Sequence, residues 1–359
     1  MVRSALDFSA FDAAVNQFIE RHNSSGARPI AGASVVVVDA ANLLHAQGYG
    51  RYAADRLYLI ASASKILSAG VIMRLCDQRT LRLDEPLRTY VPDWPASGTG
   101  DVTLAQLLSS SSGLPSVMEV TATLENLRDP YAVHLYQFVP QGTLQETGLR
   151  IYKTEPPRKP NTHFAYGGSQ WQLAGAIAEI ASGKSWAQLV RETYVEPCGV
   201  PSLGYTNPFA SARTYPPEFD GVVANLPSTD NPNIEGGAYI TAPDYGKLLQ
   251  LHLNHGLSGT ERVLSEASVA IMQQDWIAKY GGKVVSPSPI QYGEGYGLGW
   301  WINTEHDYLV APGTYGAFAW LDRKRRYAAI SIIENGHVIG GTLALEVKPI
   351  MDALIDARG

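Results

Sequence analysis

Ser62 and Lys65, three residues apart, are the pair of side chains whose types and spacing best suit chemistry. Lys65 is the only charged residue in the run from 57 to 73, LYLIASASKILSAGVIM, which is apolar on every side and lacks proline. Such a run predicts a buried helix. Burying an unpaired ammonium costs several kcal/mol, so Lys65 must be paired or must lose its proton. Because positions i and i+3 share a helix face, the amine can act on the Ser62 hydroxyl and make it a nucleophile.

The motif S-x-x-K is short, so the alternative of a solvated surface lysine stands beside this interpretation. Roughly one match is expected by chance in a chain of this composition. Ser62–Lys65 is the only match in the chain, and it falls in the one predicted helix where a lysine would have no solvent. The residues alone therefore allow both a nucleophile with its proton partner and an ordinary lysine.

Composition limits the possible partners. The 359 residues are 45% hydrophobic and 17% charged, with a net charge of −6, which predicts an ordinary globular chain with a substantial core. This net negative charge provides no basic field for nucleic acid, so we expect no nucleic-acid partner. No uninterrupted apolar run of about twenty residues occurs, so we expect no membrane span. The N-terminus lacks the apolar region of a signal peptide, which predicts a cytoplasmic protein.

Metal and cofactor motifs are weak or missing in the sequence. His252 and His255 have a metal-like spacing on a predicted helix, but without a third ligand they are expected to be surface residues, and we assign no metal. No phosphate-binding or dinucleotide-binding glycine motif occurs, so no cofactor is expected. Cys76 and Cys198 are far apart and are expected to be thiols. The esterase motif G-x-S-x-G is also missing, so an α/β-hydrolase is not supported.

Strand patterns occur near both ends of the chain. Residues 30–40 and 43–50 predict an antiparallel hairpin, and runs rich in aromatic or β-branched residues predict strands at 297–302, 315–321 and 327–334. Helical patterns lie mostly between them and at the two ends. They cover the N-terminal segment, the region 166–195 with a break at Ser182-Gly183, residues 241–255, and residues 342–358 with Pro349 as a kink or late start.

This order predicts an α+β fold. One antiparallel sheet would be built from both chain ends and flanked by helices, with a mostly helical insertion. We expect residues 1–80 and 236–359 to form the sheet domain and residues 81–235 to form the helical insertion, as one discontinuous catalytic unit. The active site should lie at their junction.

Seven stretches occur in the order and spacing of one known family. They are SASK (62–65), LRLDEPLRTYVPDW (81–94), LLSSSSGLP (107–115), PNTHFAYGGSQWQLAG (160–175), NPNIEGGAYITAPDYGKLL (231–249), YGLGWW (296–301) and APGTYG (311–316). On these stretches the chain resembles the serine β-lactamase and penicillin-binding-protein superfamily, particularly class C β-lactamase-like hydrolases and family VIII carboxylesterases. The resemblance implies a β-lactamase/transpeptidase-like fold.

The resemblance also implies roles for individual residues. Ser62 resembles the acylated nucleophile, and Lys65 its proton partner. Tyr166 resembles the tyrosine of the Y-x-N motif, a general base that then protonates the leaving group. The backbone N–H of Thr314, together with that of Ser62, would form the oxyanion hole. The start of a helix at Ser62 would further stabilise developing negative charge.

Two departures from the family pattern affect the expected substrate. Gly168 replaces the asparagine that holds the acylamide of a β-lactam, and Ala311-Pro312-Gly313 replaces K-T-G, which leaves no cation for a carboxylate. Gly168 and Gly313 therefore mark substrate-binding positions with altered chemistry. Among the tryptophans of the matching stretches, Trp171 and Trp320 are expected to form pocket walls, and the others to lie in the core.

Several functions remain open at this point. The leading expectation is a serine hydrolase that cleaves small neutral carboxylic esters through an acyl-enzyme. Acyl transfer to an alcohol or amine on the same scaffold is the second, and β-lactamase or D-peptidase activity is the third. A non-catalytic binding homologue is the fourth, although intact Ser62, Lys65 and Tyr166 speak against it. The expected partner is a small-molecule ester or acyl donor, and the sequence predicts no oligomeric state.

Overall fold

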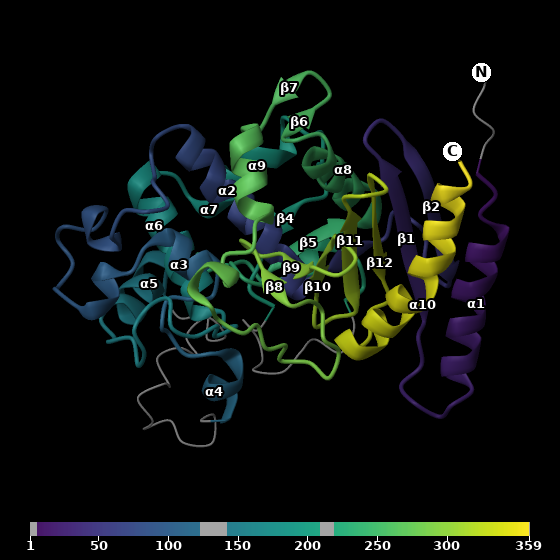
Figure 1. The fold of residues 1–359 in the computed structure, drawn as a ribbon, viewed down its shortest axis with the longest axis horizontal. Coiled ribbons are helices and arrows are strands. Elements are labelled where there is room, and N and C mark those ends of the chain that lie inside the picture. Colours follow the sequence, from purple (N-terminus) through teal and green to yellow (C-terminus); the bar gives the residue numbers. More distant parts are fainter. Residues whose placement is uncertain (1–5, 123–141, 209–218, 359) are drawn as a thin grey trace.

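A seven-stranded antiparallel sheet lies at the centre of the computed structural model, which describes residues 6–122, 142–208 and 219–358 (Figure 1). The strand order is β2-β1-β12-β11-β10-β9-β8. The strands are β1 (Gly32–Asp39), β2 (Leu43–Gly50), β8 (Gly295–Tyr296), β9 (Trp301–Asn303), β10 (Tyr308–Pro312), β11 (Ala317–Asp322) and β12 (Tyr327–Ile332). Strand β1 pairs with β12 from Ser34 opposite Ile332 to Asp39 opposite Tyr327. The predicted α+β fold, with a sheet built from both chain ends, is confirmed.

Helices cover both faces of this sheet because successive side chains of a strand point to opposite sides. Val35 and Val37 lie in one core with the first and last helices, whereas Val36 and Val38 lie in a second core with two helices from the middle of the chain. The covering helices are α1 (Ser9–Asn23), α10 (His337–Asp356), α2 (Lys65–Asp77) and α8 (Ala242–Leu253). In Figure 1, α1 and α10 lie side by side on the outer face of the sheet.

The other elements belong mostly to the middle of the chain. The helices are α3 (Leu104–Leu108), α4 (Val117–Ala122), α5 (Leu144–Tyr152), α6 (Ser169–Ser182), α7 (Trp186–Val190) and α9 (Glu266–Gln273). The short strands are β3 (Leu57–Leu59), β4 (Gly204–Tyr205), β5 (Ala238–Thr241), β6 (Leu257–Ser258) and β7 (Glu261–Arg262). Helix α6 packs against α5 and also against α2, the helix that begins at Lys65. The proposed division at residues 80 and 236 stays a prediction, and its insertion includes 123–141 and 209–218, which lie outside the described residues.

The last helix differs from its prediction. Helix α10 begins at His337, five residues before the expected start at 342, and it continues through Pro349. Proline removes one main-chain donor from the helix. The side chains of Leu343, Val347 and Met351 are nevertheless buried in the outer core, and this burial stabilises the helix across the missing bond. None of the helices in the described ranges combines the length and apolarity that a bilayer crossing requires.

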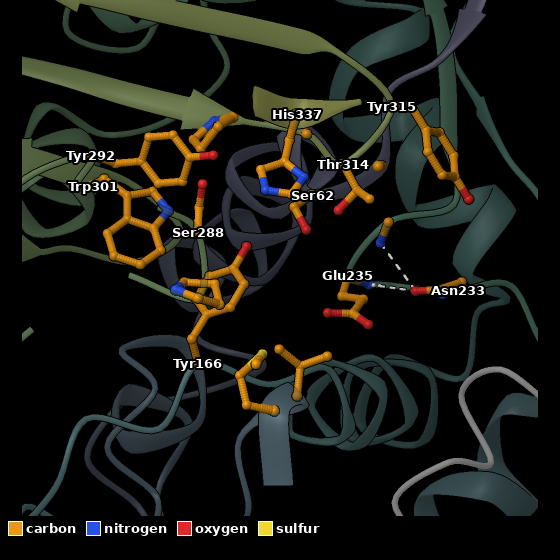
Figure 2. A pocket seen from close by; sticks show the side chains of 17 residues that line it. Ser62, Tyr166, Asn233, Glu235, Ser288, Tyr292, Trp301, Thr314, Tyr315 and His337 are labelled. Carbon is orange, nitrogen blue, oxygen red and sulfur yellow. Dashed lines mark hydrogen bonds between the residues drawn. The ribbon is translucent and has the colours of Figure 1, made fainter. Parts of the chain in front are cut away.

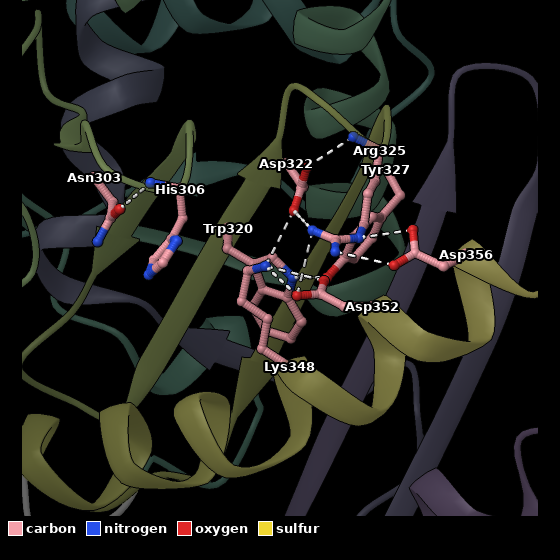
Figure 3. A network of polar contacts seen from close by, with 9 residues as sticks. All are labelled: Asn303, His306, Trp320, Asp322, Arg325, Tyr327, Lys348, Asp352 and Asp356. Carbon is pink, nitrogen blue, oxygen red and sulfur yellow. Dashed lines mark hydrogen bonds and ion pairs between the residues drawn. The ribbon is translucent and has the colours of Figure 1, made fainter.

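Trp320 points away from the expected pocket, toward α10 (Figure 3). Its indole Nε1 donates to the hydroxyl of Tyr327 at 3.0 Å, and that hydroxyl donates to Asp352 at 2.6 Å. Lys348 on α10 contacts Asp352 at 2.9 Å and the fully buried Asp322 of β11 at 3.1 Å. The prediction that Trp320 forms a pocket wall is wrong, because its position on β11 places it on the outer face, where it belongs to the polar contacts that hold α10 on the sheet.

His252 lies inside the protein rather than on its surface, contrary to expectation. Only 3% of the residue is exposed, and its ring packs edge-on against Trp300 at 5.4 Å. Its Nδ1 is buried and has no hydrogen-bond partner among the described residues. Burial lowers the pKa of His252 from its ordinary value of 6.5 to about 4. The folded protein therefore holds this imidazole neutral at a pH where the unfolded chain already binds a proton.

We expect His252 to make the protein less stable in acid. As the pH falls below about 6.5, the unfolded state takes up a proton first, so stability declines until the pH reaches the folded pKa of about 4. His252→Leu should remove roughly 2–3 kcal/mol of the stability difference between pH 8 and pH 4.5, measured by urea unfolding. His255→Leu, at an exposed position three residues away, is the matched control. An unchanged pH dependence in His252→Leu would contradict the burial argument.

Candidate active site

A small antiparallel sheet, with the strand order β3-β5-β4, brings two distant segments together. Leu59 of β3 lies opposite Tyr239 of β5, and the pairing continues as Ile60 N–H donates to the carbonyl of Ala238 at 3.1 Å. The chain leaves β3 toward Ser62 at the same end of the sheet at which it enters β5 from residue 235. Antiparallel pairing thus places residues separated by more than 170 positions beside one another.

Ser62 and Lys65 form a hydrogen-bonded pair. Ser62 lies in a short 3-10 turn, Ala61–Ser64, and Lys65 is the first residue of α2. The Lys65 Nζ donates to Ser62 Oγ at 3.0 Å, and only 1% of Lys65 is exposed. The predictions that Lys65 lies in a buried helix and presents its amine to the hydroxyl are confirmed. The predicted helix over 57–73 is too long, because residues 57–59 form strand β3 and the α-helix begins only at Lys65.

Glu235 supplies the partner that a buried ammonium needs. Its Oε2 accepts a hydrogen bond from Lys65 Nζ at 2.9 Å, and its own carbonyl oxygen accepts a second at 3.4 Å. Burial alone would lower the pKa of Lys65, but the negative charge of Glu235, followed by the contribution of Tyr166, raises it above the ordinary value. Of the two outcomes expected for Lys65, the structure shows pairing. Sequence reasoning missed Glu235, although a lone charge in the stretch NIEGGAYI was a usable signal.

Tyr166 reaches the pair from the segment that precedes α6. Lys65 Nζ lies 4.6 Å from the centre of its ring. The ring also packs against Trp301 and Tyr296, with centroids 5.1 and 6.1 Å away. The structure therefore brings Ser62, Lys65 and Tyr166 together, as the sequence predicted.

The turn after β10 packs against the chain that leads to Ser62. A Cβ atom on Gly313 would lie only 2.1 Å from the carbonyl oxygen of Ile60, so only glycine allows this approach. The next residue, Thr314, and Ser62 both line the same cavity. Within the described ranges, neither backbone N–H has a hydrogen-bond acceptor. Two free donors beside a serine hydroxyl fit the predicted oxyanion hole.

These groups open into a cavity of about 340 Å³ (Figure 2). Its lining is Ala61, Ser62, Val117, Met118, Tyr166, Asn233, Glu235, Gly236, Pro287, Ser288, Tyr292, Trp301, Pro312, Gly313, Thr314, Tyr315 and His337. Much of this wall is aromatic or aliphatic. No lysine or arginine occurs among the described residues that line it. The cavity is large enough for a small organic molecule and has few groups that would hold an anion.

Besides Trp320, two more predicted substrate positions do not line the cavity. Trp171 is fully buried in the core beside α2, with its ring 5.9 Å from Lys65 Nζ, so the prediction that it forms a pocket wall is wrong. Helical packing of α6 turns its side chain toward the core. Gly168 is the N-cap residue directly before α6 and also does not line the cavity. Trp301, which was expected in the core, is the tryptophan that lines the cavity. Gly313 lines the cavity as predicted.

His337 is a further cavity residue that sequence reasoning missed. It is the first residue of α10, and in Figure 2 its ring is turned toward the space above Ser62. Burial lowers its pKa below the ordinary 6.5, so the neutral ring predominates at pH 7. No sequence signal pointed to it, because its place depends on where α10 begins. In the part of the chain that the structure describes, no group of three or more His, Cys, Asp and Glu residues is arranged to hold a metal ion.

An antiparallel sheet, helices on both of its faces and a buried Ser-Lys pair facing a tyrosine define a protein of the β-lactamase and penicillin-binding-protein class. The chain belongs to the Beta-lactamase family, a family of serine hydrolases whose family model matches residues 11–336.

Known proteins of low sequence identity to this chain agree with this assignment. Penicillin-binding protein 4 of Amycolatopsis lactamdurans is 29% identical over 236 residues, which cover 61% of this chain and 57% of that protein, little more than half its length. A solved structure of a putative β-lactamase from Bacteroides dorei has a TM-score of 0.73 at 24% identity, over 96% of this chain and 98% of the other. The solved structure of EstCE1, a hydrolase with promiscuous acyltransferase activity, has a TM-score of 0.70 at 18% identity, over 97% and 100% of the two chains. At these identities the structural likeness establishes the fold only.

Proposed function

We propose that this protein is a serine hydrolase that cleaves small neutral carboxylic esters through an acyl-enzyme on Ser62. The observation that carries the proposal is the hydrogen bond of 3.0 Å between Ser62 Oγ and the buried Lys65 Nζ at the wall of a largely apolar cavity. A serine hydroxyl needs such a proton partner to act as a nucleophile at neutral pH. A homologue that only binds its ligand would have no use for the cost of burying this lysine.

The proposed reaction uses residues of this chain alone. Ser62 Oγ attacks the ester carbonyl carbon while its proton leaves toward Lys65. The backbone N–H groups of Ser62 and Thr314 receive the negative charge that develops on the carbonyl oxygen. The hydroxyl of Tyr166, next to Lys65, then protonates the departing alcohol. Water attacks the acyl-enzyme by the same steps in reverse order and releases the carboxylic acid.

The cavity wall supports a neutral substrate. Pro312 and Gly313 line the cavity where the family pattern has K-T-G, so that position offers no cation. The negative charge of Glu235 is balanced by Lys65, and His337 is mostly neutral at pH 7. A carboxylate would therefore find no charged partner on the described wall, whereas a neutral ester needs none. The aromatic surfaces of Tyr292, Trp301 and Tyr315 suit an apolar acyl or alcohol group.

We expect short-chain p-nitrophenyl esters to be hydrolysed with a kcat/KM at least tenfold above that of a chromogenic cephalosporin. A charge-assisted hydrogen bond is worth about 1.5–3 kcal/mol, and its absence should weaken carboxylate binding by roughly ten- to a hundredfold. Steady-state kinetics on both substrates at pH 7.5 measures this ratio, with the Ser62→Ala variant as the blank. Efficient cephalosporin hydrolysis with negligible esterase activity would contradict the proposal.

Acyl transfer is the second function that the site supports. The lining is rich in aromatic surface, which suits an alcohol acceptor better than it orders a water molecule. EstCE1, described as a hydrolase with promiscuous acyltransferase activity, shows that the fold is compatible with both reactions. The fraction of acyl groups passed to an added alcohol, measured by chromatography during ester turnover, separates transfer from hydrolysis.

A further inference from the structure

The Glu235 carboxylate and the Ser62 hydroxyl both accept hydrogen bonds from one ammonium group. Lys65 Nζ donates to Ser62 Oγ at 3.0 Å and to Glu235 Oε2 at 2.9 Å. The Lys65 side chain is 1% exposed, and that of Glu235 is 10% exposed where it lines the cavity. The three groups therefore form a continuous hydrogen-bonded path from the cavity serine to a carboxylate.

The backbone around Glu235 is held firmly enough to fix this path. The Oδ1 of Asn233 accepts hydrogen bonds from the N–H groups of Glu235 at 3.1 Å and Gly236 at 3.0 Å, as the dashed lines in Figure 2 mark. The carbonyl of Asn233 accepts a third bond from Gly237 at 2.7 Å. A Cβ atom on Gly237 would lie 2.0 Å from the carbonyl of Thr206, so this turn tolerates no side chain there. The carboxylate is thus presented to Lys65 by a rigid turn.

An ammonium that is paired with a carboxylate is not a base. Lys65 can accept the proton of Ser62 only if it gives up one of its own protons in the same step. The carboxylate that accepts a hydrogen bond from its ammonium is that of Glu235. We propose that Glu235 is a positioning residue that accepts this proton, so that Ser62, Lys65 and Glu235 work as a relay; this inference rests on the function proposed above.

Protons and electrons balance along the relay. As Ser62 Oγ bonds to the ester carbon, the carbonyl electron pair moves to its oxygen, the serine proton moves to Lys65, and a Lys65 proton moves to Glu235. Lys65 stays an ammonium, and Glu235 becomes a neutral carboxylic acid. When the bond to the departing oxygen breaks, that oxygen takes a proton from Tyr166, which regains one from Lys65, and Lys65 regains one from Glu235.

The relay predicts that activity requires ionised Glu235 and therefore falls in acid. The other titratable groups that face the pair are the phenols of Tyr166, Tyr296 and Tyr315 and, across the cavity, His337. Burial raises the pKa values of Tyr296 and Tyr315, so they stay neutral through the range of interest. Burial lowers the pKa of His337 from its ordinary 6.5. His337→Gln should keep the acid limb, that is, the fall in labelling rate at low pH.

The alternative is that Lys65 acts as a neutral amine. Glu235 would then only oppose the reaction, because it stabilises the charged form of the lysine. In that case removing the carboxylate would lower the pKa of Lys65 and speed the reaction near pH 7. The two accounts therefore predict opposite effects of Glu235→Gln.

The test is the rate at which a fluorophosphonate probe labels Ser62 between pH 5 and 9, because phosphonylation reports activation of the serine without the later hydrolysis. We expect Glu235→Gln to be labelled at least about a hundredfold more slowly at pH 7 and to lose the acid limb. Glu235→Asp should keep the limb with a smaller loss of rate. Glu346→Gln, which removes a carboxylate from an exposed ion pair with Arg21, should match the wild type.

Three results would overturn the relay. Labelling of Glu235→Gln at or above the wild-type rate would favour the neutral amine. A uniform loss at every pH, with the limb retained and thermal stability lowered, would mean that Glu235 only supports the fold. If wild-type Ser62 is not labelled at all, the proposed function fails as well, and this outcome is distinct from the other two.

Discussion

Ser62→Ala should lose ester hydrolysis by at least about 10⁴-fold in kcat while keeping the wild-type fold. The Ser62 hydroxyl is bonded to Lys65 at the cavity wall, and alanine leaves no atom to form the acyl-enzyme. Initial rates with p-nitrophenyl butyrate, together with circular dichroism and the thermal unfolding midpoint, measure both parts of the expectation.

Ser68→Ala is the matched control for this variant. Ser68 lies six residues further along the chain, in α2, and is fully buried. Its hydroxyl donates to the carbonyl of Ile234 at 2.6 Å, and Ser68 does not line the cavity. Its loss should lower stability by about 1 kcal/mol with activity largely retained. Activity of Ser62→Ala within about tenfold of the wild type would show that the nucleophile lies elsewhere.

Lys65→Arg should be nearly as damaging as Lys65→Met, with a loss of at least about a thousandfold in kcat/KM. A guanidinium keeps the positive charge beside Glu235 but does not release a proton at accessible pH, so it cannot pass one from Ser62. Methionine has a similar length and no charge. If both variants fail alike, proton transfer rather than fixed charge is the function of Lys65.

Lys348→Arg is the control that measures how replacing a buried lysine by arginine affects the protein when the lysine lies outside the cavity. Lys348 is also buried among carboxylates, but it lies on the outer face of the sheet, away from the cavity (Figure 3). The Lys348→Arg variant should change the free energy of unfolding and leave kcat/KM close to that of the wild type. A Lys65→Arg enzyme with activity within tenfold of the wild type would contradict the account, because the residue would then serve only as a fixed cation.

The sequence predicted the parts of the site that are close in the chain or belong to a recognisable family motif. Ser62 and Lys65 follow from helix spacing and an apolar run, and Tyr166 and Thr314 follow from the resemblance. The same reasoning placed the hairpin of β1 and β2 correctly, because alternation and a short turn are local signals. Burial of His252 was not predictable from its spacing alone.

The missed residues depend on contacts between distant segments. Glu235 meets Lys65 only because β3 and β5 pair in one register, and His337 reaches the cavity only because α10 begins before its expected start. The predictions that Trp320 and Trp171 form pocket walls were wrong for the same reason. Which face of β11 or α6 carries Trp320 or Trp171 is set by the two cores on either side of the sheet, and the chain's local pattern does not determine it.

The most direct measurement of the central claim is the mass of the protein quenched in acid during turnover of p-nitrophenyl butyrate. The account predicts an increase of one butyryl group, mapped by peptide sequencing to Ser62 and missing from Ser62→Ala. A butyryl group on any other residue, or steady hydrolysis by both proteins with no adduct on either, would contradict it.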